Sequence, residues 1–154
     1  MKDKSILRFI QSAKAEGRKL FALLIDPDKW SLSHFSELFS TQLSPYYDFI
    51  LLGGSEITNG NLDDCLSQIR HNTRLPIVLF PGNPDQISTK ADGLLLLSLL
   101  SGRNPEYLIG HHVNAAKKIK NSGLEIIPTA YIHIGDHTDS AVSRVSMTSP
   151  IPFS

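Results

Sequence analysis

The sequence predicts an α/β fold built on a parallel β-sheet, and two observations support this. Short runs of continuous apolar residues alternate with runs in which apolar residues recur every three or four positions. The continuous runs are typical of strands that are covered on both faces, as strands in parallel sheets are. Strands and helices that alternate in this way form right-handed crossovers. We therefore expect one α/β domain over residues 1–154.

The first half of the chain is expected to contain three strands and three helices. The helices are predicted from apolar residues at helical spacing over residues 6–13, 32–43 and 62–69. The strands are predicted from the apolar runs over residues 20–25, 49–52 and 77–80. Each of these runs ends at proline or glycine, namely at Pro27, Gly53 and Pro81. We expect the first strand to be buried on both faces.

The second half begins with an unusually short connection. Residues 81–92 leave too little room for a crossover helix and its two turns before the next apolar run, over residues 93–97. The helix that follows is expected to be capped by Asn104, to carry Pro105 in its first turn and to end at Gly123. Its expected apolar face consists of Leu108, Ile109, Val113, Ala116 and Ile119.

The last predicted element is an extended segment over residues 125–134, with a bulge or bend at Pro128. The remaining residues, 135–154, show no clear period. Two architectures fit this order of elements. One is an open five-stranded sheet, and the other is the first five strands of an eight-stranded α/β barrel.

Composition excludes several classes of function. Fifteen basic residues balance fifteen acidic ones, so no basic excess is available for a nucleic-acid partner. The single cysteine, Cys65, excludes an intramolecular disulfide framework and a CxxC metal site. The first segment is charged throughout, and no apolar run is long enough to cross a membrane. We therefore expect a soluble, cytoplasmic protein with no transmembrane segment.

Functional side chains are expected where the predicted strands end, because parallel α/β folds gather their sites there. The candidates are residues 26–29, 53–56 and 81–83, Ser98, and residues 131–133. Asp26 could bind a divalent cation or orient a hydroxyl group, or it could simply cap a turn. The Gly53-Gly54-Ser55 sequence could offer backbone N–H groups to a phosphate, or it could be a tight turn.

The remaining candidates are weaker. Two histidine pairs, His111 with His112 and His133 with His137, could be zinc ligands, but their spacing and context are more typical of packed or solvated side chains. Cys65 lies on the expected apolar face of a helix, so a core position is favoured over a nucleophile. The sequence contains no GxGxxG, GxxxxGK[ST] or GxSxG motif.

Six segments that occur in this order identify a family. The chain closely resembles the geranylgeranylglyceryl phosphate synthase family, which includes the heptaprenylglyceryl phosphate synthases. The segments that carry the resemblance are LLIDPDK (23–29), ILLGGSEIT (50–58), LPIVLFPGN (75–83), ADGLLLLSLLSGRNPEYLIGHHVNAA (91–116), EIIPTAYIHI (125–134) and SRVSMTSPIP (143–152).

The resemblance implies a modified (β/α)8 TIM-type barrel, whose third helix is replaced by an extended segment and which is truncated here to about its first five strands. It also implies a Mg²⁺-dependent prenyltransferase of ether phospholipid biosynthesis. The implied partners are sn-glycerol 1-phosphate and a polyprenyl diphosphate, and family members commonly form homo-oligomers. The family's metal positions match Asp26 and Ser55.

The resemblance also implies that some functional segments of the family are missing from these 154 residues. The family's glycerol-phosphate turns and its glutamate base lie in later segments, so no catalytic or substrate-binding residue is assigned. Two alternatives therefore remain open beside the prenyltransferase. One is an inactive truncated remnant, and the other is a phosphate-handling α/β enzyme with an open five-stranded sheet.

Overall fold

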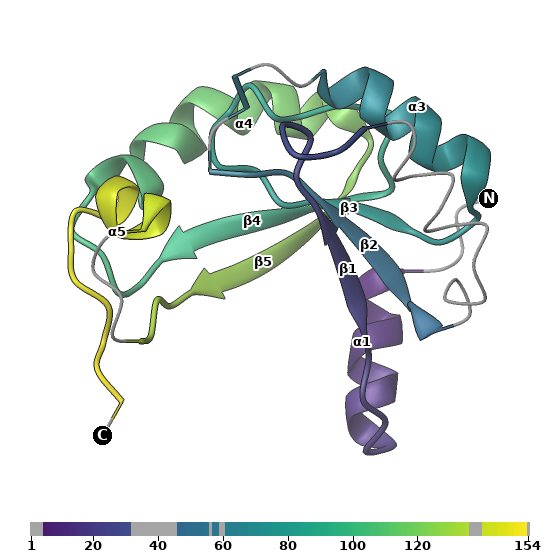
Figure 1. Ribbon diagram of the computed structural model, residues 1–154, viewed down its shortest axis with the longest axis horizontal. Coiled ribbons are helices and arrows are strands. Elements are labelled where there is room, and N and C mark those ends of the chain that lie inside the picture. The colour runs from purple at the N-terminus through teal and green to yellow at the C-terminus, as the bar shows by residue number, and fades with distance from the viewer. Residues whose placement is uncertain (1–4, 32–45, 56, 59–60, 136–139, 154) are drawn as a thin grey trace.

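The computed structural model describes residues 5–31, 46–55, 57–58, 61–135 and 140–153. Its centre is a parallel sheet of five strands in the order β1-β2-β3-β4-β5 (Figure 1). The prediction of five parallel strands in sequence order is therefore confirmed. The strands are β1 (Ala22–Ile25), β2 (Phe49–Leu52), β3 (Ile77–Leu79), β4 (Gly93–Leu99) and β5 (Glu125–Tyr131).

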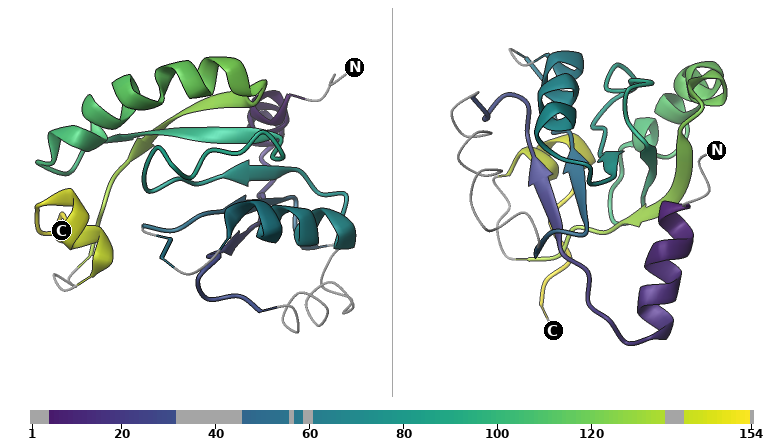
Figure 2. Two further views of the ribbon diagram at one scale, coloured as in Figure 1. Left: turned by 90° about the horizontal axis from the view of Figure 1, so that it is seen from above. Right: turned by 90° about the vertical axis from the view of Figure 1, so that its right-hand side faces the viewer.

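Helices lie on both faces of this sheet. Helices α3 and α4 lie over one face, whereas α1 lies on the opposite side, as the views in Figures 1 and 2 agree. The described helices are α1 (Ile6–Ala15), α3 (Leu62–Asn72), α4 (Gly110–Ser122), α5 (Ala141–Ser146) and the short 3₁₀ turn η2 (Pro105–Tyr107). The helix expected over residues 32–43 falls outside the described residues.

The core is divided between the two faces because side chains alternate along a strand. In the central strand β3, Ile77 and Leu79 pack on the face covered by α3 and α4, whereas Val78 packs with Ile6 of α1. All three β3 residues are buried, as the continuous apolar run predicted. The connection from β3 to β4 contains no helix, in agreement with its predicted shortness.

The prediction for the first strand was wrong in both its bounds and its burial. The strand was expected over residues 20–25 with both faces buried, but β1 covers only Ala22–Ile25, and the Leu24 side chain is 50% exposed. The Leu24 side chain faces a cavity instead of a helix.

The helix after β4 is a second correction, because it starts later and packs through a different stripe than expected. Asn104 caps the η2 turn, by accepting a hydrogen bond from the Glu106 amide, and α4 begins only at Gly110. Most of the expected face is exposed, with Ile109 and Val113 more than 60% accessible, whereas Ile119 packs against the core as expected.

The stripe that α4 does pack against the sheet contains His112, Ala115 and Ile119. Ala115 and Ile119 belong to the core, and His112 Nε2 lies 2.6 Å from the carbonyl oxygen of Leu97 in β4. This polar contact holds that side of the helix on the sheet. Ile109 and Val113 face outward.

The carboxyl-terminal part holds two further differences. Pro128 makes no bulge, since the pairing of β4 with β5 is continuous from Gly93↔Glu125 to Leu99↔Tyr131, and an edge strand tolerates the missing N–H. Residues 135–154, for which no element was predicted, contain α5. Beyond it, Ile151 forms a parallel bridge with Ile134, so the strand–helix–strand pattern continues past β5.

Glu125 fastens α1 to the amino-terminal end of β5. Its carboxylate accepts hydrogen bonds from Ser5 Oγ at 2.7 Å, from the Ile6 amide at 2.6 Å and from the Leu7 amide at 2.9 Å. Burial alone would raise the pKa of this carboxyl. The hydrogen bonds and the nearby Arg8 outweigh burial, so the pKa of Glu125 lies below its ordinary value of 4.5.

This arrangement predicts a pH-dependent contribution to stability. Because the folded pKa of Glu125 is lower than the unfolded one, the carboxylate stabilises the fold above pH 4.5 and loses this effect as the pH falls through the folded value. Glu125→Gln is expected to cost about 0.5–2 kcal/mol at pH 7, the usual range for losing a helix cap. Urea unfolding at pH 7 and pH 3 measures this. An equal difference between variant and wild type at both values would contradict it.

Candidate functional site

Asp26 and Ser55 lie at the same end of the sheet. They follow β1 and β2, which pair in parallel up to Ile25↔Leu52, and the Gly53 amide extends this pairing by donating to the Ile25 carbonyl at 3.0 Å. The Asp26 carboxylate lies directly against the glycine loop. A Cβ atom added to Gly54 would be 3.1 Å from Asp26 Oδ1. The expected juxtaposition is present, and the role of both residues as metal ligands remains a prediction.

The Asp26 side chain both shapes its own turn and remains accessible. Oδ1 accepts a hydrogen bond from the Asp28 amide at 3.1 Å, as a turn-capping aspartate does. Oδ2 lies 3.1 Å from Nζ of Lys29, whose side chain is 79% exposed. Ion pairs with exposed lysines contribute little, so a cation or an anionic ligand can replace this one at small cost.

The loops after β2 and β3 approach one another so closely at this end that only glycine fits. Gly53 has φ +151°, and a Cβ there would lie 2.1 Å from the Phe80 carbonyl oxygen. A Cβ on Gly82 would lie 2.2 Å from the Ser55 carbonyl oxygen and 2.4 Å from that of Gly54. The loops after β2 and β3 therefore form one continuous backbone surface beside Asp26.

Gln86 is a site residue that sequence reasoning missed. It is only 4% exposed, and its amide bonds to the loops that follow β2 and β3. Oε1 accepts hydrogen bonds from the amides of Gly54 and Gly82, and Nε2 donates to the Gly54 carbonyl. The one available signal was a polar residue next to Ile87 in a connection too short for a helix.

A cavity of about 440 Å³ opens at this end of the sheet. One side is polar and contains Asp26, Lys29 and Ser55, whereas most of the remaining wall is apolar or aromatic. The apolar wall comes from four strands or strand ends, from the loop after β1, from η2 and from α5, and includes Leu24, Trp30, Phe80, Leu97, Leu99, Tyr107, Tyr131, Val142 and Val145.

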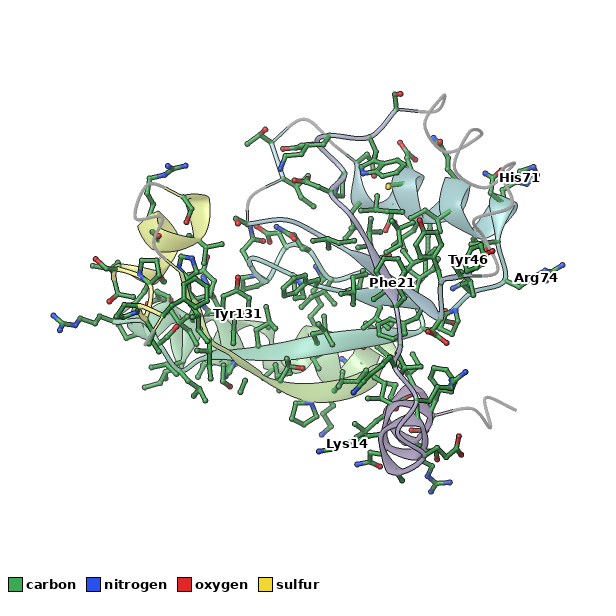
Figure 3. The ribbon with its side chains drawn as sticks, turned by 60° about the horizontal axis from the view of Figure 1, so that its bottom comes forward. Lys14, Phe21, Tyr46, His71, Arg74 and Tyr131 are labelled. Atoms are coloured by element: carbon green, nitrogen blue, oxygen red, sulfur yellow. The ribbon has the colours of Figure 1, made fainter. Side chains whose placement is uncertain are left out.

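Tyr131 brings the end of β5 to the cavity and is labelled in Figure 3. Its ring centroid lies 6.1 Å from that of Phe80, at an interplanar angle of 47°. Burial raises the pKa of Tyr131 above its ordinary value, so the hydroxyl stays protonated at neutral pH. The residue therefore contributes an aromatic wall with one hydrogen-bonding group.

Other predicted candidates are placed elsewhere. Leu97 and Leu99 line the cavity, whereas Ser98 between them does not. The backbone amide of His133 donates to Ser101 Oγ at 2.8 Å. Glu56 and His137 lie outside the described residues.

Among the described residues, His111, His112 and Cys65 are in packing positions. His111 packs edge-on against Tyr107, and His112 contacts the backbone of β4. Within the part of the chain that the structure describes, no group of three His, Cys, Asp or Glu residues could hold a metal ion. Cys65 is buried in α3, and burial raises its pKa to about 11, so it is a thiol at neutral pH.

The polar side of the cavity fits Mg²⁺ better than a softer metal. Asp26 supplies a carboxylate and Ser55 a hydroxyl, which are both hard oxygen donors. Protein Mg²⁺ sites often use only one or two carboxylates and leave the other positions to water and substrate phosphates. The bare Cα of Gly54 leaves space beside Asp26 Oδ1 that a side chain would fill.

Comparison with known proteins shows close relatives. The chain is 48% identical over 146 residues to geranylgeranylglyceryl phosphate synthase of Zunongwangia profunda, and 48% identical over 139 residues to the synthase of Chitinophaga pinensis. These matches cover 95% and 90% of this chain, and 62% and 55% of the relatives. The chain thus spans little more than half the length of the curated relatives it matches.

The fold is also similar to that of a solved synthase. The crystal structure of (S)-3-O-geranylgeranylglyceryl phosphate synthase from Thermoplasma acidophilum, in complex with its substrate sn-glycerol-1-phosphate, superposes with a TM-score of 0.85 at 32% identity. The match covers 97% of this chain and 60% of that one. A family model, the PcrB family, matches residues 13–153. The chain belongs to the PcrB family.

Proposed function

We propose that the chain is part of a Mg²⁺-dependent prenyltransferase that joins sn-glycerol 1-phosphate to a polyprenyl diphosphate of the geranylgeranyl type. The observation that carries this proposal is the two-sided cavity. A prenyl diphosphate has a highly charged head and a long apolar tail, and the cavity has a polar end at Asp26 and an apolar, aromatic wall. The names of the relatives support the same substrate class.

The residues at the polar end have distinct roles in this proposal. Asp26 and Ser55 would hold Mg²⁺, which offsets charge on the diphosphate and so improves it as a leaving group. Lys29, paired with Asp26 at 3.1 Å, would turn to the diphosphate oxygens. The apolar wall, including Leu24 and Phe80, would surround the prenyl chain and exclude water from the reacting carbon.

The reaction is a substitution at the first carbon of the prenyl diphosphate. The 3-hydroxyl of glycerol phosphate forms the new C–O bond, the bond to diphosphate breaks, and the hydroxyl proton passes to a base. Asp26 is the sole carboxylate among the described residues that line the cavity. This observation favours a second candidate, a chain that binds the diphosphate without turning it over.

The proposal also concerns location and assembly. A cytoplasmic protein agrees with the single, buried, free cysteine. Within the described residues, no helix is long and apolar enough to cross a membrane. A homo-oligomer agrees with the exposed apolar side chains of Val113 on α4 and of Ile109 at its N-cap.

Calorimetry and product analysis test the proposal together. The purified chain is expected to bind geranylgeranyl diphosphate in the presence of Mg²⁺ and at least about tenfold more weakly with excess EDTA. Incubation of both substrates with Mg²⁺, followed by mass spectrometry of the lipid extract, reports ether formation. Binding without ether product favours the second candidate, and absence of Mg²⁺-dependent binding contradicts both.

A further inference from the structure

We infer that Gln86 is a positioning residue for the cation site, which acts by fixing the loop that carries Ser55 against Asp26. The inference rests on the proposed function, because it assigns a role relative to that site. It concerns a residue that does not itself line the cavity. The evidence is the pattern of hydrogen bonds from its side chain.

The Gln86 side chain holds both backbone groups of one residue. Its Oε1 accepts from the Gly54 amide at 3.4 Å, and its Nε2 donates to the Gly54 carbonyl at 3.0 Å. Oε1 also accepts from the Gly82 amide at 3.2 Å. This pattern imitates a strand neighbour, and it continues sheet-like pairing beyond the ends of β2 and β3.

The fixed peptide groups flank the proposed ligands. Gly54 precedes Ser55 directly, and a Cβ on Gly54 would lie 3.1 Å from Asp26 Oδ1. Rotation of the Gly54 peptide would therefore move the Ser55 side chain relative to the Asp26 carboxylate. Glycine has no intrinsic preference that would prevent such rotation, so the restraint must come from a neighbour. Gln86 provides it.

The local sequence holds Gln86 in place. Asn83 Oδ1 accepts from the Asp85 amide at 2.9 Å, and the Asn83 carbonyl accepts from the Gln86 amide at 3.2 Å, which closes a turn. The next residue, Ile87, is buried in the main core. The connection therefore presents Gln86 inward between a closed turn and a core anchor, an arrangement that the absence of a helix between β3 and β4 permits.

Loss of the Gln86 amide is expected to weaken the cation site more than the fold. Gln86→Met keeps similar volume but leaves the amides of Gly54 and Gly82 without their partner. Substituting a residue that orients a metal ligand through a hydrogen bond typically lowers the metal affinity about 10- to 100-fold. A residue with a purely structural role would lower the unfolding midpoint and leave the Mg²⁺ dependence unchanged.

The experiment titrates Mg²⁺ at a fixed saturating concentration of geranylgeranyl diphosphate and follows binding by calorimetry. The matched control is Arg70→Met, which removes an ion pair at the opposite end of the strands. In that pair, Arg70 Nη2 lies 2.6 Å from Asp92 Oδ2. We expect Gln86→Met to raise the half-saturating Mg²⁺ concentration about 10- to 100-fold and Arg70→Met to leave it unchanged. Unfolding midpoints of both variants are measured in parallel.

Each outcome decides the matter. An unchanged Mg²⁺ requirement in folded Gln86→Met overturns the inference and leaves the proposed function standing. Absence of Mg²⁺-dependent binding in the wild type overturns both. If Gln86→Met does not fold, the wild-type chain is titrated by NMR: the side-chain amide signals of Gln86 should shift with Mg²⁺ and diphosphate, and those of Gln11 in α1 should not. Unmoved Gln86 signals overturn the inference.

Discussion

Replacing Asp26 with asparagine is expected to abolish Mg²⁺-dependent binding of geranylgeranyl diphosphate. Asparagine keeps the oxygen that accepts a hydrogen bond from the Asp28 amide, so the turn after β1 can form as before. It loses the negative charge that a hard divalent cation requires. Substituting a residue that only orients a metal ligand changes the metal affinity by up to about 100-fold. Loss of the charge of the ligand itself is therefore expected to lower the affinity by more than that factor.

The matched control for this change is Asp28→Asn. Asp28 lies two residues away, and its Oδ2 accepts from the amide and hydroxyl of Thr58, at 2.8 and 2.9 Å. The control removes the same charge from the same turn without touching the carboxylate that faces Gly54. Calorimetric titration with and without Mg²⁺ separates the two. Equal losses in both variants would show a general charge effect and contradict a specific role for Asp26.

Much of the fold could be predicted because the first three strands are continuous apolar runs followed closely by glycine or proline. The run over residues 77–80 and the brief connection after it were sufficient to predict a central strand and a missing helix, and both are present. The position of Asp26 and Ser55 followed from the same logic, because residues after neighbouring parallel strands must meet at one edge.

What could not be predicted depends on contacts between distant segments. The packed stripe of α4 includes the polar His112, whose ring contacts the Leu97 carbonyl, so the apolar period alone predicts a different stripe. The helix α5 has only six residues, too few to show a helical period, and is held by its surroundings. Arg103 and Asn104 donate to the carbonyls at its end. Gln86 was invisible for the same reason, since Gly54, one of its two partner residues, lies in the loop after β2, 32 positions away.

The second large effect is expected from Gly53→Ala, which should destabilise the fold and eliminate the cation site together. At Gly53 two costs coincide. The backbone has φ +151°, a conformation that residues other than glycine rarely adopt. The new Cβ would also lie 2.1 Å from the Phe80 carbonyl oxygen. Strained backbone and overpacking each cost about 1–3 kcal/mol, so the combined loss is about 2–6 kcal/mol. Typical domains have a free energy of unfolding of roughly 5–15 kcal/mol, so this loss is a large part of it.

Two other glycines separate these costs. Gly123 has φ +68° with no atom within 4 Å of an added Cβ, so Gly123→Ala carries only the backbone cost, about 1–2 kcal/mol. Gly82→Ala carries mainly the clash, because its Cβ would lie 2.2 Å from the Ser55 carbonyl oxygen. Urea unfolding should rank Gly53→Ala as the most damaging change, and calorimetry should show lost Mg²⁺-dependent binding in Gly82→Ala but not in Gly123→Ala. If all three variants lose equal stability and still bind Mg²⁺, the loops after β2 and β3 do not pack as the structure shows, and the site cannot depend on their contact.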